Sequence, residues 1–397
     1  MAFGIYTSVP FCRTKCSYCN FASDVFSRAV FERYVDRVCA DIAAAPRVAN
    51  EMGGQLDREV DSIYLGGGTP TVLEPDQLQR VFAAVHAQFQ VQRDAEITVE
   101  CAPGTLTAEV LDALLTCGVN RVSLGVQSFV DAEAAAVGRL HKRATVLEDI
   151  DRLRAAGITN INIDLIAGLP HQTPESWQQS LSETIATGVP HVSIYMLEVD
   201  EDSRLGRELI AGGARYHAHF VPDEDATADF YLAACERLEP AGVAQYEISN
   251  FACAGFQSRH NLKYWTRQPY LGFGVDAHSM LTSASPEDEA VRFSTVDSLD
   301  KYVAGLPLIN SKISREAALE ENFFLGLRLN CGVDLRTIAS NFGEPALENH
   351  TSTIKELVGG GMIHEDGNVI RLTPRGRLLS NEVFQAFLAP QIGSRSI

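Results

Sequence analysis

The chain has 397 residues, which is room for one large domain of ~250–300 residues and a smaller one, or for two or three ordinary domains. Its formal net charge of −18 argues against nucleic acid as the main partner and against a polybasic membrane anchor. No apolar run is long enough to span a bilayer, no cleavable leader precedes the first predicted strand, and nine cysteines suit a reducing compartment, so we expect a cytoplasmic protein.

The first predicted strand, residues 4–9, leads through Pro10 into a loop with the pattern C-x3-C-x2-C, formed by Cys12, Cys16 and Cys19. Short gaps between the three thiolates let the backbone close around one metal centre. A structural zinc site and an ordinary [4Fe–4S] cluster each take four protein ligands, so three cysteines leave one metal position open to a small ligand. A zinc loop completed by a distant ligand is the alternative at this point.

Strand and helix patterns alternate after this loop. Strands are predicted at 60–65, 96–101, 120–126, 160–166 and 191–197, and helices at 28–45, 77–89, 106–117, 132–156 (broken near His141) and 175–187. Such alternation requires parallel strands joined by crossover helices. An open doubly wound sheet and a partial barrel give the same pattern, and both place a ligand site at the carboxyl ends of the strands.

The remaining chain predicts smaller units. We expect a helix over 223–239 and a strand over 245–251, followed by a segment rich in aromatic, histidine and glycine residues. From about residue 299, helical patterns and a hairpin turning at Asp366-Gly367 predict an α+β, winged-helix-like domain without the basic helix face of a DNA-binding module. We divide the chain into a barrel core (1–220), a barrel extension (221–298) and a C-terminal domain (299–397).

Glycine and polar residues gather where the predicted strands end. The run Gly66–Gly68 and Thr69 follow the second strand, where glycines let the backbone approach a ligand, although a tight turn is the favoured interpretation of this run on its own. Glu100 ends the third strand and Gln127 ends the fourth. Asp164 lies within the fifth strand, where its burial needs a partner, so a structural hydrogen bond is its alternative role.

The cysteine spacing on a loop after the first strand resembles the radical S-adenosylmethionine (SAM) superfamily. This resemblance implies a partial (β/α)6 barrel and a [4Fe–4S] cluster held by the three cysteines, with SAM on the fourth iron. Three further motifs resemble, more narrowly, the oxygen-independent coproporphyrinogen III oxidase-like family: GGGTPT at 66–71, GVQSF at 125–129 and NIDLIAGLP at 162–170. This resemblance extends from residue 5 to about residue 388.

The family resemblance also implies which residues contact the cofactor. The aromatic residue before the last cluster cysteine would pack near the SAM adenine, although ordinary loop packing explains it equally well. The SAM contacts implied in this way are Tyr6, Tyr18, Gly67, Gly68, Thr69, Glu100, Gln127, Arg139 and Asp164.

Two features separate the chain from the true oxidases. Phe21 stands where the oxidases carry a fourth cysteine, and the sequence begins almost at the first strand, where they carry an extension. The sequence instead has His260-Asn261-x-x-Tyr264-Trp265, which resembles the haem chaperone branch of the family. Histidine is a common axial ligand of haem iron, and tyrosine and tryptophan offer flat apolar faces. The resemblance thus implies haem binding by this segment, and a core histidine among aromatics is the alternative.

The resemblance implies a haem chaperone that carries a SAM-bound cluster, binds haem and transfers it to haem-accepting respiratory proteins. It further implies peripheral contact with membrane proteins and a cluster-dependent homodimer. The enzymatic alternative is oxidative decarboxylation of coproporphyrinogen III through a 5′-deoxyadenosyl radical, and the sequence leaves open whether SAM is cleaved. A zinc-binding interaction protein is a third, minor interpretation.

Overall fold

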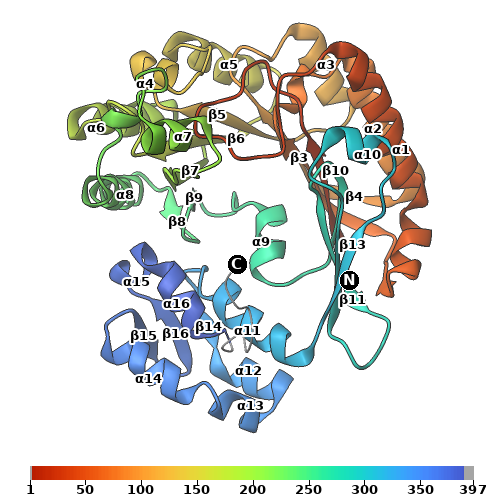
Figure 1. Ribbon diagram of the computed structural model, residues 1–397, viewed down its shortest axis with the longest axis vertical. Coiled ribbons are helices and arrows are strands. Elements are labelled where there is room, and N and C mark those ends of the chain that lie inside the picture. The colour runs from red at the N-terminus through yellow and green to blue at the C-terminus, as the bar shows by residue number, and fades with distance from the viewer. Residues whose placement is uncertain (1, 389–397) are drawn as a thin grey trace.

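One curved sheet of 13 strands organises residues 2–388, the part of the chain that this computed structural model describes (Figure 1). Its strands are β1 (Phe3–Val9), β2 (Gly54–Gln55), β3 (Glu59–Gly67), β4 (Gln90–Cys101), β5 (Arg121–Gln127), β6 (Asn160–Ala167), β7 (His191–Met196), β8 (Ala244–Gln245), β9 (Asn250–Ala252), β10 (Tyr270–Gly274), β11 (His278–Ser283), β12 (Ala290–Ser294) and β13 (Ile309–Ile313). Their order is β13-β12-β11-β10-β1-β3-β4-β5-β6-β7-β9-β8, with β2 beside β11. The strands from β10 to β7 in this order are parallel.

The predicted partial barrel is confirmed. In the described part of the chain the sheet ends at β13 and β8, which do not pair with each other. The helices of this part are α1 (Arg28–Glu51), α2 (Pro75–Gln88), α3 (Ala108–Thr116), α4 (Asp131–Ala136), α5 (Arg143–Ala155), α6 (Pro174–Thr187), α7 (Arg204–Ala211), α8 (Glu224–Leu238), α9 (Arg259–Trp265) and α10 (Leu299–Val303), with 3₁₀ turns η1 (Pro70–Val72) and η2 (Ala218–Phe220). Figure 1 shows α1 to α6 and α8 outside the curved sheet and α9 on its concave side.

The two faces of the parallel strands differ, because successive side chains point to opposite sides of a sheet. The face beneath the helices is apolar, and its fully buried side chains include Ile5, Ile63, Val99, Val122 and Ile161. The concave face carries buried polar side chains, including Ser62, Thr98, Arg121, Ser123, Asn162 and Ser193. The helix-facing side supplies the core, and the concave side supplies a polar interior.

The structure corrects some predicted elements and adds others. The strand predicted over 245–251 is wrong, because residues 244–252 form a short antiparallel hairpin of β8 and β9. The break near His141 is confirmed by the separate helices α4 and α5. Helix α7 and strands β10 to β13 were not predicted, and β10 extends the parallel sheet on the free side of β1.

The predicted C-terminal α+β domain is present. It comprises α11 (Arg315–Gly326), β14 (Val333–Asp334), α12 (Leu335–Phe342), α13 (Glu344–Glu348), α14 (Thr351–Gly359), β15 (Ile363–Asp366), β16 (Val369–Leu372), α15 (Pro374–Leu378) and α16 (Ser380–Ala386). The large sheet continues to Ile313, beyond the boundary predicted at residue 299, and residues 389–397 of that predicted domain lie outside the described residues. Buried Glu321 of α11 joins the two parts, since it accepts hydrogen bonds from Arg267 at 2.8 Å and Arg292 at 2.9 Å.

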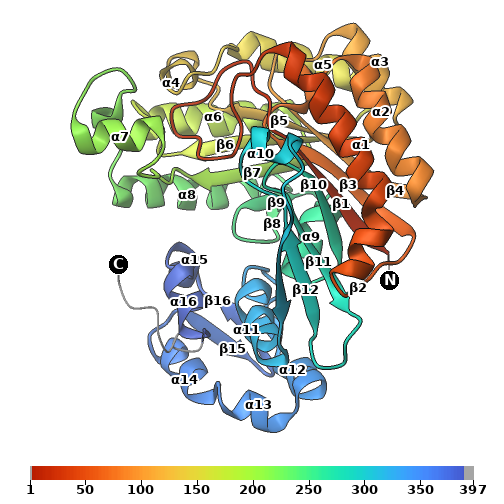
Figure 2. The ribbon, with the colours of Figure 1, turned by 45° about the vertical axis from the view of Figure 1, so that its right-hand side comes forward.

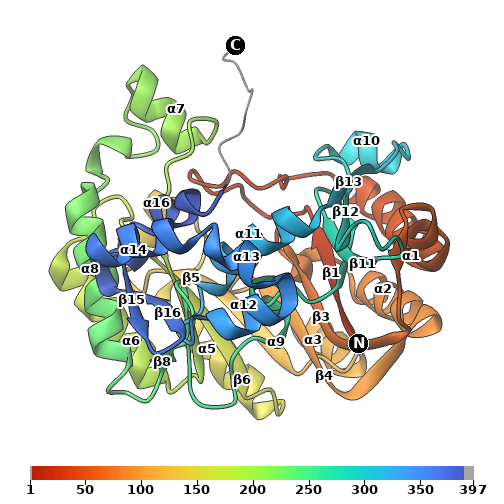
Figure 3. The same ribbon diagram turned by 90° about the horizontal axis from the view of Figure 1, so that it is seen from below.

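Figures 2 and 3 show that the C-terminal domain lies on the open side of the curved sheet, near α9. Across residues 2–388, no helix combines the length and apolarity that a membrane span requires.

Candidate functional site

The three predicted cluster cysteines lie together on the loop between β1 and α1. Cys16 is buried, Cys12 and Cys19 are half-buried, and all nine cysteines of the chain are free thiols. The loop turns tightly, because the backbone N–H of Cys19 donates to the carbonyl of Cys16 at 3.3 Å. Burial raises the pKa of the Cys12 and Cys19 thiols, so metal binding would have to displace their protons.

The donors of this loop are three thiols, the ligand type that holds iron–sulfur clusters. Among the described residues, no group of three His, Cys, Asp or Glu side chains is spaced to hold one ion. Thiolates that bind separate irons of a cluster stand farther apart than the ligands of one zinc ion. Hydrogen bonds to sulfur are also present, from Thr69 Oγ1 to Cys12 Sγ at 3.8 Å and between Ser23 Oγ and Cys19 Sγ at 3.9 Å. Such donors stabilise sulfur that carries negative charge.

Arg139 joins the cysteine loop to the end of β5. Its guanidinium donates to Sγ of Cys16 at 3.6 Å and also to the carbonyl of Gly125. Gln127, at the end of the same strand, has a left-handed backbone (φ 68°), and its amide lies near the same guanidinium. The predicted site residues Arg139 and Gln127 are therefore brought together with the cluster loop.

The glycine run packs against the cysteine loop from the end of β3. The backbone N–H of Thr69 donates to the carbonyl of Phe11 at 2.7 Å, and that of Gly67 (φ 94°) donates to Glu100 at 3.0 Å. Both N–H groups donate to acceptors within the protein, so the glycine run holds the cysteine loop in position. A Cβ atom on Gly68 would lie 2.6 Å from the carbonyl oxygen of Val9 and 2.8 Å from that of Phe11.

We expect Gly68→Ala to destabilise the protein by about 1–3 kcal/mol, because the backbone of the cysteine loop must move to admit the methyl group. Urea unfolding of the two proteins measures this change. Gly359→Ala is the matched control, because a Cβ atom there meets nothing within 4 Å. Equal stability of Gly68→Ala and wild type would show that the loop does not depend on this contact.

Glu100 and Asp164 place two carboxylates inside the barrel. Glu100 accepts from the hydroxyl of Tyr64 at 2.9 Å as well as from Gly67, and burial, followed by the charge of Asp164, raises its pKa to about 7. Asp164 accepts from Ser123 at 3.0 Å and from Asn162 at 2.7 Å, and burial raises its pKa too. Both carboxylates thus have structural partners, and both suit hydroxyl or ammonium groups of a ligand.

The two predicted tyrosines have different surroundings. Tyr6 of β1 faces the concave side, with its ring centre 6.1 Å from that of Tyr64 and 6.4 Å from that of His260. Tyr18 packs beside an apolar cluster that includes Val137 and Leu169, so it is both a loop-packing residue and a neighbour of the cysteines. The structure brings the predicted SAM contacts to the carboxyl-end rim and interior of one barrel.

The His260 segment forms α9, which lies on the concave side of the sheet nearer the opposite end of the strands. Glu96 holds the start of this helix, accepting from the backbone N–H groups of Arg259 at 3.0 Å and His260 at 3.1 Å. His260 is 1% exposed, with Nδ1 hydrogen-bonded to Ser62 at 3.0 Å and Nε2 to the Tyr264 hydroxyl at 2.8 Å. Both ring nitrogens are occupied, as in the core-histidine alternative.

The other residues of this segment pack among themselves and against the C-terminal domain. Tyr264 makes edge contacts with Trp265 and Tyr270. The guanidinium of Arg328 lies 4.2 Å from the centre of a Trp265 ring, and the indole N–H of Trp265 is buried without a partner. Asn261 is half-buried, and its backbone N–H is capped by a serine side chain. Tyr264 and Trp265 are both half-buried, so part of each ring is covered by these neighbours.

Sequence reasoning missed several residues of the interior. Tyr64 positions Glu100, Glu96 positions α9, and Arg121 is a buried arginine whose Nε has no partner. The charge of Arg121 opposes the rise that burial causes in the pKa of Glu100 and Asp164, and it adds to the fall that burial causes in the pKa of His260. The signal for them is that side chains two positions apart in a strand lie on the same face of the sheet. Tyr64 lies two positions before Gly66. Arg121 lies two positions before Ser123 and four before Gly125.

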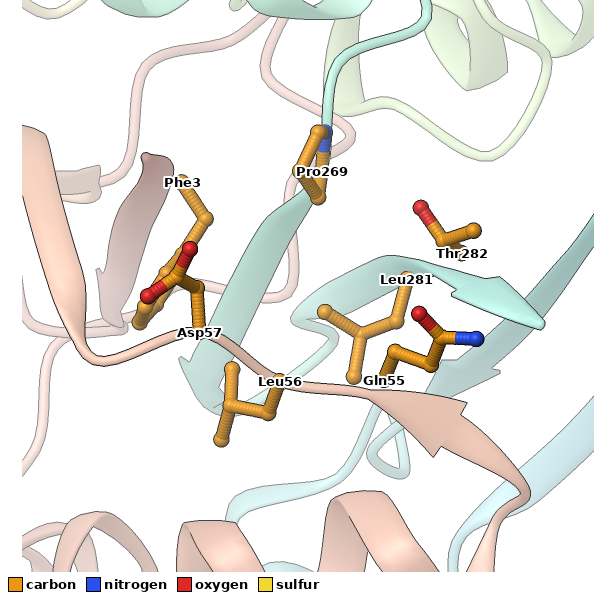
Figure 4. Close-up of a pocket in the computed structure, with 7 residues that line it drawn as sticks. All are labelled: Phe3, Gln55, Leu56, Asp57, Pro269, Leu281 and Thr282. Atoms are coloured by element: carbon orange, nitrogen blue, oxygen red, sulfur yellow. The ribbon is translucent and has the colours of Figure 1, made fainter. Parts of the chain in front are cut away.

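A pocket of about 360 Å³ lies away from this site, at the start of β1. Figure 4 shows its lining, which comes from β1, the segment around β2, the residue before β10, and β11. Phe3 and Leu281 give it apolar walls, and Gln55 and Asp57 give it polar ones. None of the predicted site residues lines it.

Comparisons with known proteins agree with this geometry. Residues 6–183 match the radical SAM superfamily, and residues 313–379 match the HemN C-terminal domain. The solved structure of coproporphyrinogen III oxidase (HemN) from Escherichia coli is 24% identical in sequence to this protein. The two structures align over 97% of this chain and 90% of the HemN chain with a TM-score of 0.82, which shows a shared fold.

Relatives match the chain over nearly their whole length. The chain is 34% identical to heme chaperone HemW of Bacillus subtilis, over 96% of this chain and 98% of that protein. It is 32% identical to heme chaperone HemW of Lactococcus lactis, over 98% of this chain and 97% of that protein. The chain therefore belongs to the HemW family within the radical SAM superfamily.

Proposed function

We propose that this protein is a haem chaperone, which binds haem and transfers it to acceptor proteins. The similarity to heme chaperone HemW proteins over 96–98% of the chain carries this proposal. Respiratory enzymes are the acceptors we propose, reached by peripheral contact with membrane proteins from a cytoplasmic location. A homodimer that depends on the cluster belongs to the same proposal.

We further propose that Cys12, Cys16 and Cys19 hold a [4Fe–4S] cluster. SAM would lie between this loop and the barrel interior, in reach of the carboxylates of Glu100 and Asp164. The hydrogen bonds of the three sulfurs with Ser23, Thr69 and Arg139 support this placement. When bound, the cluster and SAM supply one-electron chemistry.

The predicted haem ligand His260 has the correct protonation state for binding iron. Burial, with the nearby charges of Lys263 and Arg121, lowers its pKa to about 3, so the ring is neutral at physiological pH. A neutral imidazole is the form that ligates a metal. Ligation through Nε2 nevertheless requires the hydroxyl of Tyr264 to give up its hydrogen bond and the helix to open.

Two variants test His260 as the ligand. Tyr264→Phe removes only the hydroxyl that occupies Nε2, so we expect it to bind haem at least as tightly as wild type, whereas His260→Ala should lose the haem signal of this segment. Haem titration followed by absorbance measures both. If His260→Ala melts at a lower temperature but keeps the wild-type haem spectrum, His260 is a structural core residue.

Haem transfer tests the function itself. Haem-loaded protein, mixed with an apo haem protein, should give the absorbance of the holo acceptor faster than free haem at the same concentration. A wild-type protein that binds no haem would contradict the chaperone proposal. Consumption of coproporphyrinogen III with SAM and a reductant would instead favour the decarboxylase.

A further inference from the structure

Two histidines from distant parts of the chain meet at one corner of the molecule. His171 follows β6, and His217 lies between α7 and η2. Nε2 of His171 lies 3.1 Å from Nδ1 of His217, and the ring of Phe220 stacks on His171 at 4.2 Å. His171 and Phe220 are exposed and His217 is half-buried. We call this group the histidine corner.

The backbone holds the histidine corner in place. His171 N–H donates to the carbonyl of Phe220 at 2.9 Å, and Phe220 N–H donates to that of His217 at 2.9 Å. Both histidines have left-handed backbones, with φ of 68° and 61°, which costs free energy in residues other than glycine. The segment before His217 is tied down by Glu208, whose carboxylate accepts from three backbone N–H groups, those of residues 215, 216 and 218.

The pair has the arrangement of a metal ligand and its supporting residue. A metal-binding histidine usually donates its second ring N–H to an acceptor, which fixes the tautomer and the ring orientation. Here Nδ1–H of His217 would donate to Nε2 of His171, leaving Nε2 of His217 for iron. Both rings cannot bind one haem iron, because axial ligands stand on opposite faces of the porphyrin and these nitrogens are 3.1 Å apart.

The surroundings suit the other parts of haem. Phe220 is 57% exposed, and Leu209 and Ile210 on the neighbouring α7 are 50% and 67% exposed, which leaves apolar surface for a macrocycle. Arg215 lies over the Tyr216 ring at 5.4 Å from its centre, and its cation suits a propionate. Helix α7 also contacts the cluster loop, since the backbone N–H of Leu205 donates to the carbonyl of Ser17 at 2.8 Å.

We infer that the histidine corner is an exposed haem-exchange site, with His217 as axial ligand and His171 as its positioning residue. The inference rests on the proposed haem chaperone function and names a site where that function operates. Transfer to another protein needs haem that a partner can reach, and His260, at 1% exposed, does not meet this need without opening of the barrel.

Haem titration of the cluster-reconstituted full chain tests the site, with His217→Ala, His171→Ala and His260→Ala compared with wild type. We expect the histidine corner to give a haem signal of its own, separate from that of the His260 segment. His217→Ala should lose this signal, and His260→Ala should retain it. His171→Ala should weaken the same signal by about 10- to 100-fold, the usual effect of removing a supporting residue, and shift its absorbance maximum. His219→Ala is the matched control, because His219 is an exposed histidine of the same segment outside the pair, and should change nothing.

The outcomes separate this inference from the proposed function. Haem binding by His217→Ala with the wild-type spectrum and affinity would overturn the site and leave the chaperone function standing. Absence of haem binding by wild type would overturn both. Binding of Zn²⁺ by wild type but not by His217→Ala, with haem binding equal in the two, would assign the corner to a divalent cation and overturn its haem role.

Discussion

Replacing Cys16 with serine is expected to remove the iron–sulfur cluster and leave the anaerobically reconstituted protein colourless. Cys16 is buried, and its sulfur accepts from Arg139 at 3.6 Å, which ties it to the end of β5. Two remaining thiolates cannot hold three irons, and iron should fall from about four atoms per chain to near zero. Iron and sulfide analysis with the visible spectrum measures the loss.

Cys331→Ser is the control for this variant. Cys331 is an exposed free thiol in the C-terminal domain, so its loss should leave iron content and colour unchanged. Wild-type iron in the Cys16 variant would mean that iron is bound elsewhere. Zinc in place of iron in the wild-type protein after anaerobic purification would favour the zinc-binding alternative.

The parallel strands were predictable because their helix-facing residues are apolar and the chain alternates regularly between strand and helix. The strands β10 to β13 were missed because their meaning depends on a distant pairing: Tyr270 to Gly274 become barrel strand only by lying beside Gly4 to Ser8. The strand predicted over 245–251 contained enough apolar and aromatic residues for one strand, but a turn at 246–249 folds it into a hairpin. The pattern of apolar and polar residues along this stretch does not predict such a turn.

The site was predictable at its rim and less so in its interior. The cysteine loop, the glycine run and Glu100 lie at the carboxyl ends of strands, so parallel topology alone brings them together. Arg121 and Tyr64 sit within strands, and their roles appear only when the polar face of the sheet is known. For His260 the motif indicates a haem ligand, but the motif does not predict the hydrogen bonds of its ring to Ser62 and Tyr264. These bonds depend on where α9 packs.

Replacing Glu100 with glutamine is expected to make the stability of the SAM-free protein much less dependent on pH. Burial and the charge of Asp164 raise the pKa of Glu100 from 4.5 to about 7 in the folded chain. A carboxyl whose pKa is raised on folding contributes stability that is present below its unfolded value and is lost as pH rises through its folded value. Wild type should therefore lose stability between about pH 4.5 and pH 7, by on the order of 3 kcal/mol.

The glutamine variant carries no charge at this position at any pH, so this loss should be absent from it. The stability of Glu100→Gln relative to wild type should consequently increase from pH 5 to pH 8, and urea unfolding of the two proteins at both values measures the difference. Glu59→Gln, at an exposed position at the start of the same strand as Tyr64, controls for the removal of a carboxylate. A constant difference between Glu100→Gln and wild type at both pH values would mean that Glu100 is already ionised at pH 5. Its hydrogen bonds from Tyr64 and Gly67 would then outweigh burial, and the barrel interior would hold a permanent negative charge facing the ligand.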